Sequence, residues 1–228
     1  GSAMEWTVER DYAREALPKR DPEGHKGTFG EVLALAGSVG YTGAAWLTAE
    51  GAVRGGCGLV HLGVPEDIWP VEAVKCTSAM PFPLAAEDGG LSLRAMEGIR
   101  ERLSRCDVLA LGPGLGRRAE TAELIRRLLS ETEKPAVLDA DGINAVSAHI
   151  DSLDGRRGRV TVLTPHDGEF ARLGGDVTHG GRIRAARDFA CAHGCVLVLK
   201  GHRTIIAAPD GRIAINTTGN SGMAKGGS

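Results

Sequence analysis

The sequence predicts an α/β domain: a central, mostly parallel sheet with helices on both faces. Three observations carry the α/β prediction. Short apolar runs alternate with segments of helical spacing along the whole chain. These runs are apolar throughout, which is typical of parallel strands that are buried on both faces. Glycine-rich loops follow several of the runs directly and lead into helices, as in strand–loop–helix units.

The expected strands are short apolar runs bounded by glycine, proline or polar clusters. They cover residues 32–36, 59–64, 108–111, 136–139, 160–163 and 196–200. Residues 204–208 and 212–216 are expected to form a hairpin, because Pro209-Asp210-Gly211 between them is typical of a tight turn.

The expected helices lie between the strands, except for one that precedes the first strand, and their apolar residues recur at helical spacing. They cover residues 5–20, 44–53, 91–103, 119–129, 142–149, 167–173 and 183–192. The first is bracketed at its end by Pro18 and Pro22, and the second is apolar and rich in alanine.

Length and charge narrow the class of protein. A chain of 228 residues fits one domain, expected at residues 5–228, with residues 1–4 expected to be a tag remnant. A net charge of −2 argues against a nucleic-acid partner, and no apolar run reaches the roughly 18 residues that span a bilayer.

Five scattered cysteines indicate reduced thiols in a cytoplasmic protein. The segment from Cys191 to Cys195 lacks a second ligand pair, so no metal site is expected.

Glycine is the unusual residue of this sequence. There are 33 glycines, about twice the average usage of roughly 7%. They cluster in loops at residues 37–43 and 112–116 and in the run at 216–228, whose backbone can present bare N–H groups to an anion, most often phosphate. Neither the dinucleotide fingerprint nor a Walker A sequence is present. Any single loop could serve only a tight turn, but three at one sheet edge favour a shared binding role.

Polar residues follow the expected strands at the same edge. Asp139 and Asp141, with Asn144 behind them, end one strand, and the two carboxylates point the same way if the strand continues. The alternative is that Asp141 caps the next helix. His166 ends another strand, either as a structural histidine or as a ligand contact.

Lys200 and Gly201 end the strand before the hairpin. A mobile ammonium followed by glycine suits contact with a nucleotide phosphate, although a solvated loop can have the same residues.

Together these stretches resemble the ADP/ATP-dependent NAD(P)H-hydrate dehydratases of the ribokinase-like superfamily, in the family's order across nearly all of residues 25–228. The motifs that carry the resemblance are His25-Lys26-Gly27, Gly40-Tyr41-Thr42-Gly43-Ala44-Ala45, Gly112-Pro113-Gly114-Leu115-Gly116-Arg117, Asp139-Ala140-Asp141, Thr164-Pro165-His166, Lys200-Gly201 and Thr217-Thr218-Gly219-Asn220.

The resemblance implies repair of hydrated NADH or NADPH: a nucleotide phosphorylates the hydroxyl at C6 of the nicotinamide ring, and phosphate is then eliminated. It implies ADP in bacterial members or ATP in eukaryotic ones, with Mg²⁺. By position, the hydrated dinucleotide would be contacted by Ala44, Gly114 and His166, with Asp141 and Asn144 beside it. The nucleotide would be held by Lys200, Gly201, His202, Arg203, Thr204, Gly226 and Gly227.

One family feature is outside this sequence. The catalytic Asp is expected in a Gly-Asp pair just after the Gly-Gly-Ser segment, and the sequence ends at Ser228, so no catalytic residue is assigned and impaired catalysis is expected. The domain is likewise expected to lack its C-terminal helices. Apolar strand faces exposed in this way would favour a homo-oligomer. A non-catalytic nucleotide- or dinucleotide-binding module and a ribokinase-like small-molecule kinase remain the alternatives, and the choice between ADP and ATP stays open.

Overall fold

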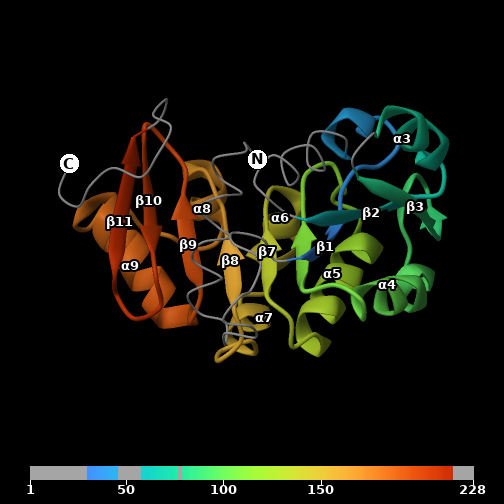
Figure 1. Cartoon of the computed structure of the whole chain (residues 1–228). Coiled ribbons are helices and arrows are strands. Elements are labelled where there is room, and N and C mark those ends of the chain that lie inside the picture. The colour runs from blue at the N-terminus through green and yellow to red at the C-terminus, as the bar shows by residue number, and fades with distance from the viewer. Residues whose placement is uncertain (1–29, 46–57, 77–78, 218–228) are drawn as a thin grey trace.

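The computed structural model describes residues 30–45, 58–76 and 79–217 (Figure 1). Its strands are β1 (Glu31–Leu35), β2 (Leu59–Pro65), β3 (Met80–Leu84), β4 (Ala86–Glu87), β5 (Gly90–Leu91), β6 (Val108–Leu111), β7 (Ala136–Leu138), β8 (Thr161–Leu163), β9 (Val196–Leu199), β10 (Arg203–Ala207) and β11 (Ile213–Thr217). Its helices are α3 (Trp69–Lys75), the 3-10 helix η1 (Leu93–Ala95), α4 (Met96–Leu103), α5 (Ala119–Glu131), α6 (Asp141–Ser147), α7 (Asp151–Asp154), α8 (Asp167–Arg172) and α9 (Gly181–His193).

Nine of these strands form one sheet in the order β11-β10-β9-β8-β7-β6-β1-β2-β3. The strands from β9 to β3 are all parallel, and β10 runs antiparallel to both of its neighbours. The predicted parallel sheet and the terminal hairpin are therefore confirmed. Strands β4 and β5 form a separate two-stranded hairpin.

Both faces of the sheet are buried, which explains why its strands are apolar throughout. Leu33 and Leu35 of β1 belong to one core cluster, together with side chains of α4, α5, α6, α8 and α9. Val32 and Ala34 alternate with them and belong to a second cluster on the opposite face, which also contains Ala45 and Ile68. The period of two along a strand thus divides one apolar run between two cores.

The sequence analysis assigned no element to residues 65–90, where the structure has α3, β3 and β4. Strand β3 contains Pro81 and Pro83, which have no backbone N–H to give to a neighbour. It tolerates them because, among the described strands, it lies at the edge of the sheet and pairs with β2 alone.

Two other expectations change in detail. The helix expected from residue 91 begins with η1 and continues as α4, since Leu91 belongs to β5. Residues 42–45 are helical, as expected for the start of the 44–53 helix, whereas its remainder and the helix expected at 5–20 lie outside the described residues. None of the described helices is long and apolar enough to cross a membrane.

Candidate functional site

The predicted site residues gather at the carboxyl-end edge of the sheet, meaning the loops that follow β1, β6, β7, β8 and β9. These five strands are consecutive neighbours in the sheet, so their loops line one continuous edge (Figure 1). This is where open parallel sheets bind ligands.

The first two glycine loops pack on each other. The hydroxyl Oγ of Ser38 donates to the carbonyl oxygen of Gly114 at 2.6 Å, and the Gly37 N–H donates to the Pro113 carbonyl at 3.0 Å. Gly114 has a φ of 78°, and a Cβ there would lie 2.8 Å from the Cβ of Ala44. The two positions expected to contact the dinucleotide are therefore neighbours, and glycine is required at 114 both for its backbone conformation and for this close approach.

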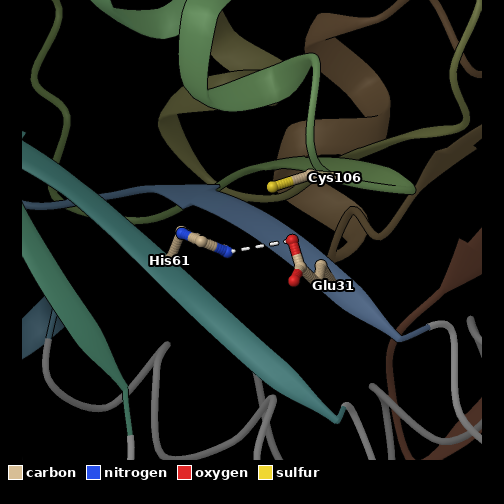
Figure 2. Close-up of side chains that lie close together, drawn as sticks. All are labelled: Glu31, His61 and Cys106. Atoms are coloured by element: carbon tan, nitrogen blue, oxygen red, sulfur yellow. Dashed lines mark hydrogen bonds and ion pairs between the residues drawn. The ribbon is translucent and has the colours of Figure 1, made fainter.

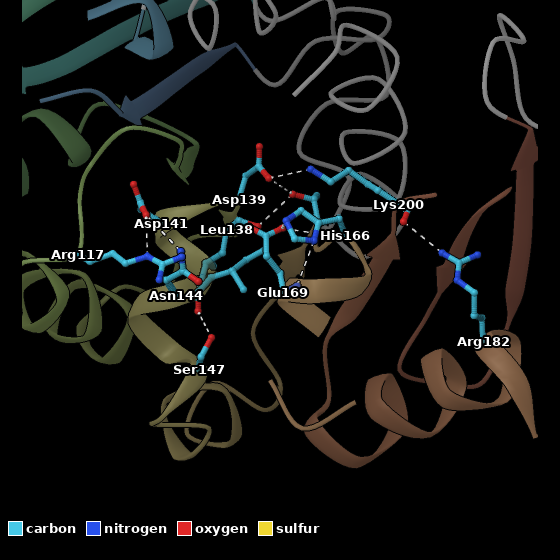
Figure 3. Close-up of polar contacts among 12 residues, drawn as sticks. Arg117, Leu138, Asp139, Asp141, Asn144, Ser147, His166, Glu169, Arg182 and Lys200 are labelled. Carbon is cyan, nitrogen blue, oxygen red and sulfur yellow. Dashed lines mark hydrogen bonds and ion pairs between the residues drawn. The ribbon is translucent and has the colours of Figure 1, made fainter. Parts of the chain in front are cut away.

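The carboxylate of Asp141 joins the second glycine loop to α6. Its Oδ2 accepts from the Gly116 N–H at 2.9 Å, and its Oδ1 accepts from Nδ2 of Asn144 at 3.2 Å (Figure 3). The guanidinium Nε of Arg117 lies 3.9 Å from the same Oδ1. The structure thus brings Asp141 and Asn144 together with the second glycine loop.

The expectation that Asp139 and Asp141 point the same way does not hold, because β7 ends at Leu138 and the chain bends between the two carboxylates. Ala140 has φ 50° and ψ −113°, a conformation that costs energy for any residue with a Cβ. The alternative role of Asp141 as helix cap is not observed either: Ala140 is the N-cap of α6 and makes no side-chain capping bond. The bend directs the two carboxylates to different partners.

Asp139 meets Lys200 across the edge. Its Oδ1 accepts from the hydroxyl of Thr164 at 2.9 Å and from the ammonium Nζ of Lys200 at 3.2 Å (Figure 3). Burial acts to raise the pKa of the Asp139 carboxyl, but the Lys200 charge and these two hydrogen bonds outweigh it and hold the pKa below its ordinary value. The Asp139 carboxyl is therefore ionised at neutral pH and lies beside the Lys200 side chain.

His166 has a structural function at the start of α8. Its Nδ1 accepts from the Glu169 N–H at 3.2 Å, while a Glu169 carboxylate oxygen accepts from the His166 N–H at 3.0 Å, which completes a capping box. The imidazole remains 57% exposed, so capping leaves much of the ring accessible. The Lys200 N–H donates to the Pro165 carbonyl at 2.8 Å and thereby holds these two segments side by side.

The segment 200–204, called the nucleotide loop from here on, runs from the end of β9 into β10. One side chain that the sequence analysis did not single out contacts both ends of it: Arg182, in the first turn of α9, donates to the carbonyl oxygens of Lys200 and Arg203. Nothing local in the sequence distinguishes Arg182 from Arg184 and Arg187 on the same helix. The predicted Gly226 and Gly227 lie outside the described residues.

A second polar cluster lies at the amino-end edge of the same sheet (Figure 2). Glu31, His61 and Cys106 place their polar side-chain atoms within 4.8 Å of one another, and among the described residues they are the one group of this kind. Nδ1 of His61 lies 3.0 Å from the Arg102 guanidinium, which can only donate, so Nε2 carries the proton and donates to Glu31 at 3.2 Å.

Glu31, His61 and Arg102 are joined in a continuous hydrogen-bond network, with Arg102 beside one ring nitrogen of His61 and Glu31 beside the other. Burial raises the pKa of the Cys106 thiol to about 11, and Arg102 brings a further positive charge. We therefore assign the cluster a structural role. The described cysteines are free thiols: Cys106 and Cys195 are buried, Cys76 is half-buried and Cys191 is exposed, while Cys57 lies outside the described residues.

The carboxyl-end edge thus combines backbone N–H groups in glycine loops, an exposed imidazole and an ammonium–carboxylate pair. Phosphoryl transfer requires mainly positioning and charge stabilisation from a protein, and these groups supply both.

Comparison of the sequence with protein families gives a match that covers nearly the same residues as the sheet and its helices. The family model described as NAD(P)H-hydrate dehydratase matches residues 32–228. A bifunctional NAD(P)H-hydrate repair enzyme of Moorella thermoacetica is 45% identical over 221 residues, which are 95% of this chain and 42% of that protein. The chain therefore spans less than half the length of this bifunctional relative. The ADP-dependent (S)-NAD(P)H-hydrate dehydratase of Bacillus subtilis is 36% identical over 225 residues, which are 97% of this chain and 75% of that protein.

Solved structures agree on the fold. A ribokinase-like superfamily protein of Enterococcus faecalis superposes with a TM-score of 0.72 at 26% identity, covering 96% of this chain and 73% of that one. The ADP/ATP-dependent NAD(P)H-hydrate dehydratase of Bacillus subtilis, co-crystallized with ATP and Mg²⁺, superposes with a TM-score of 0.63 at 30% identity, covering 92% of this chain and 72% of that one. The fold is ribokinase-like, as the sequence predicted.

Proposed function

Because this chain belongs to the NAD(P)H-hydrate dehydratase family, we propose that its carboxyl-end edge binds hydrated NADH or NADPH beside ADP or ATP for nucleotide-dependent dehydration. The observation that carries the proposal is the ion pair between Lys200 and Asp139, which lies next to the segment of His166 and at the centre of the edge.

We place the dinucleotide over the glycine loops and the nucleotide over the nucleotide loop. Ala44 and Gly114 adjoin each other, and Asp141 and Asn144 fix the next turn of chain, so one surface of small side chains is available to a flat ring. The nucleotide loop lies on the other side of β8 and β7 from this surface and contributes Lys200, Gly201, His202, Arg203 and Thr204. Gly226 and Gly227 are assigned to the nucleotide by resemblance alone. His166, between the two groups, is assigned to the dinucleotide.

Lys200 is the group expected to stabilise the transferring phosphoryl charge. Its ammonium lies 3.2 Å from a carboxylate oxygen of Asp139 and its side chain is 22% exposed, so a phosphate oxygen can approach it from the solvent side. Asp139 aims the ammonium, and Thr164 in turn holds Asp139. Backbone N–H groups of the loops at this edge would donate hydrogen bonds to the remaining phosphate oxygens.

A magnesium ion fits this arrangement as a partner of the nucleotide. Mg²⁺ in such sites is held by one or two carboxylates, several waters and the substrate phosphates. The bend at Ala140 directs Asp139 and Asp141 apart, so at most one of these carboxylates would join the waters and phosphates around the ion, and the described residues form no cluster of three metal ligands at this edge. The ion would neutralise phosphate charge during transfer.

A general base for the substrate hydroxyl is unassigned among the described residues. Asp139 is tied to Lys200 and Thr164, and Asp141 to Gly116 and Asn144, so each carboxylate already has a positional task. This observation favours a second candidate function, nucleotide and dinucleotide binding without turnover. Both functions predict binding of the two ligands, and turnover distinguishes them.

One experiment separates these outcomes. The chain is mixed with hydrated NADH, Mg²⁺ and ADP or ATP, and recovery of the reduced-nicotinamide absorbance is followed while calorimetry measures the binding of each ligand. Binding of a nucleotide and of the hydrate supports the site. Absence of binding at millimolar ligand would contradict it, and rapid turnover would contradict only the expected impairment.

A further inference from the structure

We propose that Arg182 is a positioning residue that holds the nucleotide loop in its binding conformation and ties it to the segment of His166. The inference rests on the proposed function, since it concerns the same nucleotide, and it assigns Arg182 no contact with substrate.

The guanidinium of Arg182 bonds the two ends of the nucleotide loop at once. Its Nη2 donates to the Lys200 carbonyl at 3.2 Å (Figure 3). Its Nη1 donates to the Arg203 carbonyl at 2.8 Å. The loop between these carbonyls contains Gly201 and His202 and carries the side chains expected to meet phosphate. A planar fork that bonds both ends fixes the span of the loop, which a single contact would not do.

Gly201 shows that this approach is close. A Cβ at Gly201 would lie 2.7 Å from Nη2 of Arg182, well inside ordinary contact distance. The absence of a side chain at 201 therefore serves the guanidinium as well as any ligand.

The same guanidinium reaches the dinucleotide side. Its Nε donates to the carboxylate of Asp167 at 3.1 Å, and Asp167 directly follows His166 at the start of α8. The Lys200 N–H bonds the Pro165 carbonyl from the other direction. His166 and Lys200 are thus held in register by a backbone bond on one side and by Arg182 on the other.

Because the Nε and both Nη atoms of Arg182 already donate within the protein, its effect on phosphate is indirect. A loop ordered before binding loses less conformational freedom when the ligand arrives, and this raises affinity without a new contact.

The test compares Arg182→Ala, Arg182→Lys and a matched control, Arg184→Ala, in the full chain. Arg184 lies two residues further along α9, is 68% exposed and pairs only loosely with Asp188, at 3.8 Å. Calorimetry measures the dissociation constants of ADP, ATP and NADH, and thermal unfolding measures stability.

We expect Arg182→Ala to weaken nucleotide binding about tenfold, which corresponds to ~1.4 kcal/mol, while NADH binding changes less than about twofold. Arg182→Lys should remain as weak as Arg182→Ala, because a point charge cannot bond both ends of the loop. Arg184→Ala should match the wild type.

Unchanged nucleotide affinity in Arg182→Ala would overturn the inference. So would full rescue by lysine, which would show that charge alone matters. Equal loss of NADH and nucleotide binding together with lowered thermal stability would show that Arg182 is only a structural residue, and this would also overturn the inference. If Arg182→Ala does not fold, the nucleotide affinity of Arg182→Lys decides instead. Failure of the wild type to bind any nucleotide would instead overturn the proposed function.

Discussion

The two edges of the sheet carry similar side chains but use them differently. At the amino-end edge, His61 is 4% exposed and lies between Glu31 and Arg102, with its two ring nitrogens both bonded. At the carboxyl-end edge, His166 also has a bonded nitrogen but keeps 57% of its side chain exposed. A histidine, an acid and a cation are present at each edge, so residue type alone does not identify the binding edge.

Arg156 shows the structural use of charge most clearly. It is 1% exposed, and no carboxylate bonds it. Its five N–H donors are all satisfied, by the carbonyls of Leu129, Thr132, Lys134 and Val160 and the hydroxyl of Thr161. The backbone carbonyls that accept from Arg156 are fixed in place, so a ligand cannot take over these hydrogen bonds. Lys200, by contrast, meets a side-chain carboxylate near solvent, and a phosphate can take over part of that contact.

The largest expected effect is on stability, and it tests the structural role of the Arg156 charge. Arg156→Ala should lower the free energy of unfolding by ~3 kcal/mol or more, because it leaves several buried carbonyls without donors. Chemical denaturation measures the change. The control is Arg127→Ala, which removes an exposed pair with Glu123 and should cost ~0.5 kcal/mol or less. Equal losses in the two variants would erase the distinction between the buried and exposed arginines.

Next in size is a pair of lysine variants. Lys200→Ala should weaken ADP or ATP binding about 10- to 100-fold, the range for a lost charge-assisted hydrogen bond. Lys134→Ala removes bonds to the carbonyls of Leu103 and Cys106 at the other edge and should change stability but not nucleotide affinity. Calorimetry measures the nucleotide affinity of both variants. A weaker affinity in Lys134→Ala would contradict the assignment of nucleotide binding to the carboxyl-end edge.

A glycine pair probes how tightly the binding edge is built. A Cβ at Gly142 would lie 2.5 Å from the Leu111 carbonyl oxygen, which cannot move without disturbing β6. Gly142→Ala should therefore destabilise the protein by ~1–3 kcal/mol. At Gly43 no described residue lies within 4 Å of the added Cβ, so Gly43→Ala should be neutral in the same unfolding measurement.

The smallest effect is a pH dependence at the amino-end edge. Burial, with further contributions from Arg102 and Arg105, lowers the pKa of His61 below its ordinary value of 6.5, although Glu31 acts to raise it. The unfolded chain therefore binds the proton more readily, and the stability that neutral His61 provides is present above about pH 6.5 and is lost as the pH falls below it. His61→Gln should flatten this part of the stability profile measured by denaturation, and an unchanged slope would remove His61 from the account.

The sequence was informative where local pattern decides the structure. Apolar runs such as 108–111 became strands with the expected boundaries, and the strand-end residues Asp141, His166 and Lys200 came to one edge because parallel strands place their loops there. The bend at Ala140 could not be predicted, since alanine rarely adopts that conformation.

Arg156 and Arg182 were missed for a different reason. Arg156 lies in Gly155-Arg156-Arg157-Gly158-Arg159, which is typical of a solvated loop, and Arg182 lies on a helix with other arginines. Only the tertiary structure determines which of several similar side chains meets backbone carbonyls.

The central claim, that ligands bind at the carboxyl-end edge, is tested most directly by amide hydrogen exchange with and without a nucleotide and NADH. The account predicts slower exchange in the segments 112–116, 164–168 and 200–204 and unchanged exchange at 59–62 and 105–108. Protection at the amino-end edge, or no protection in any of the three loop segments, would contradict it.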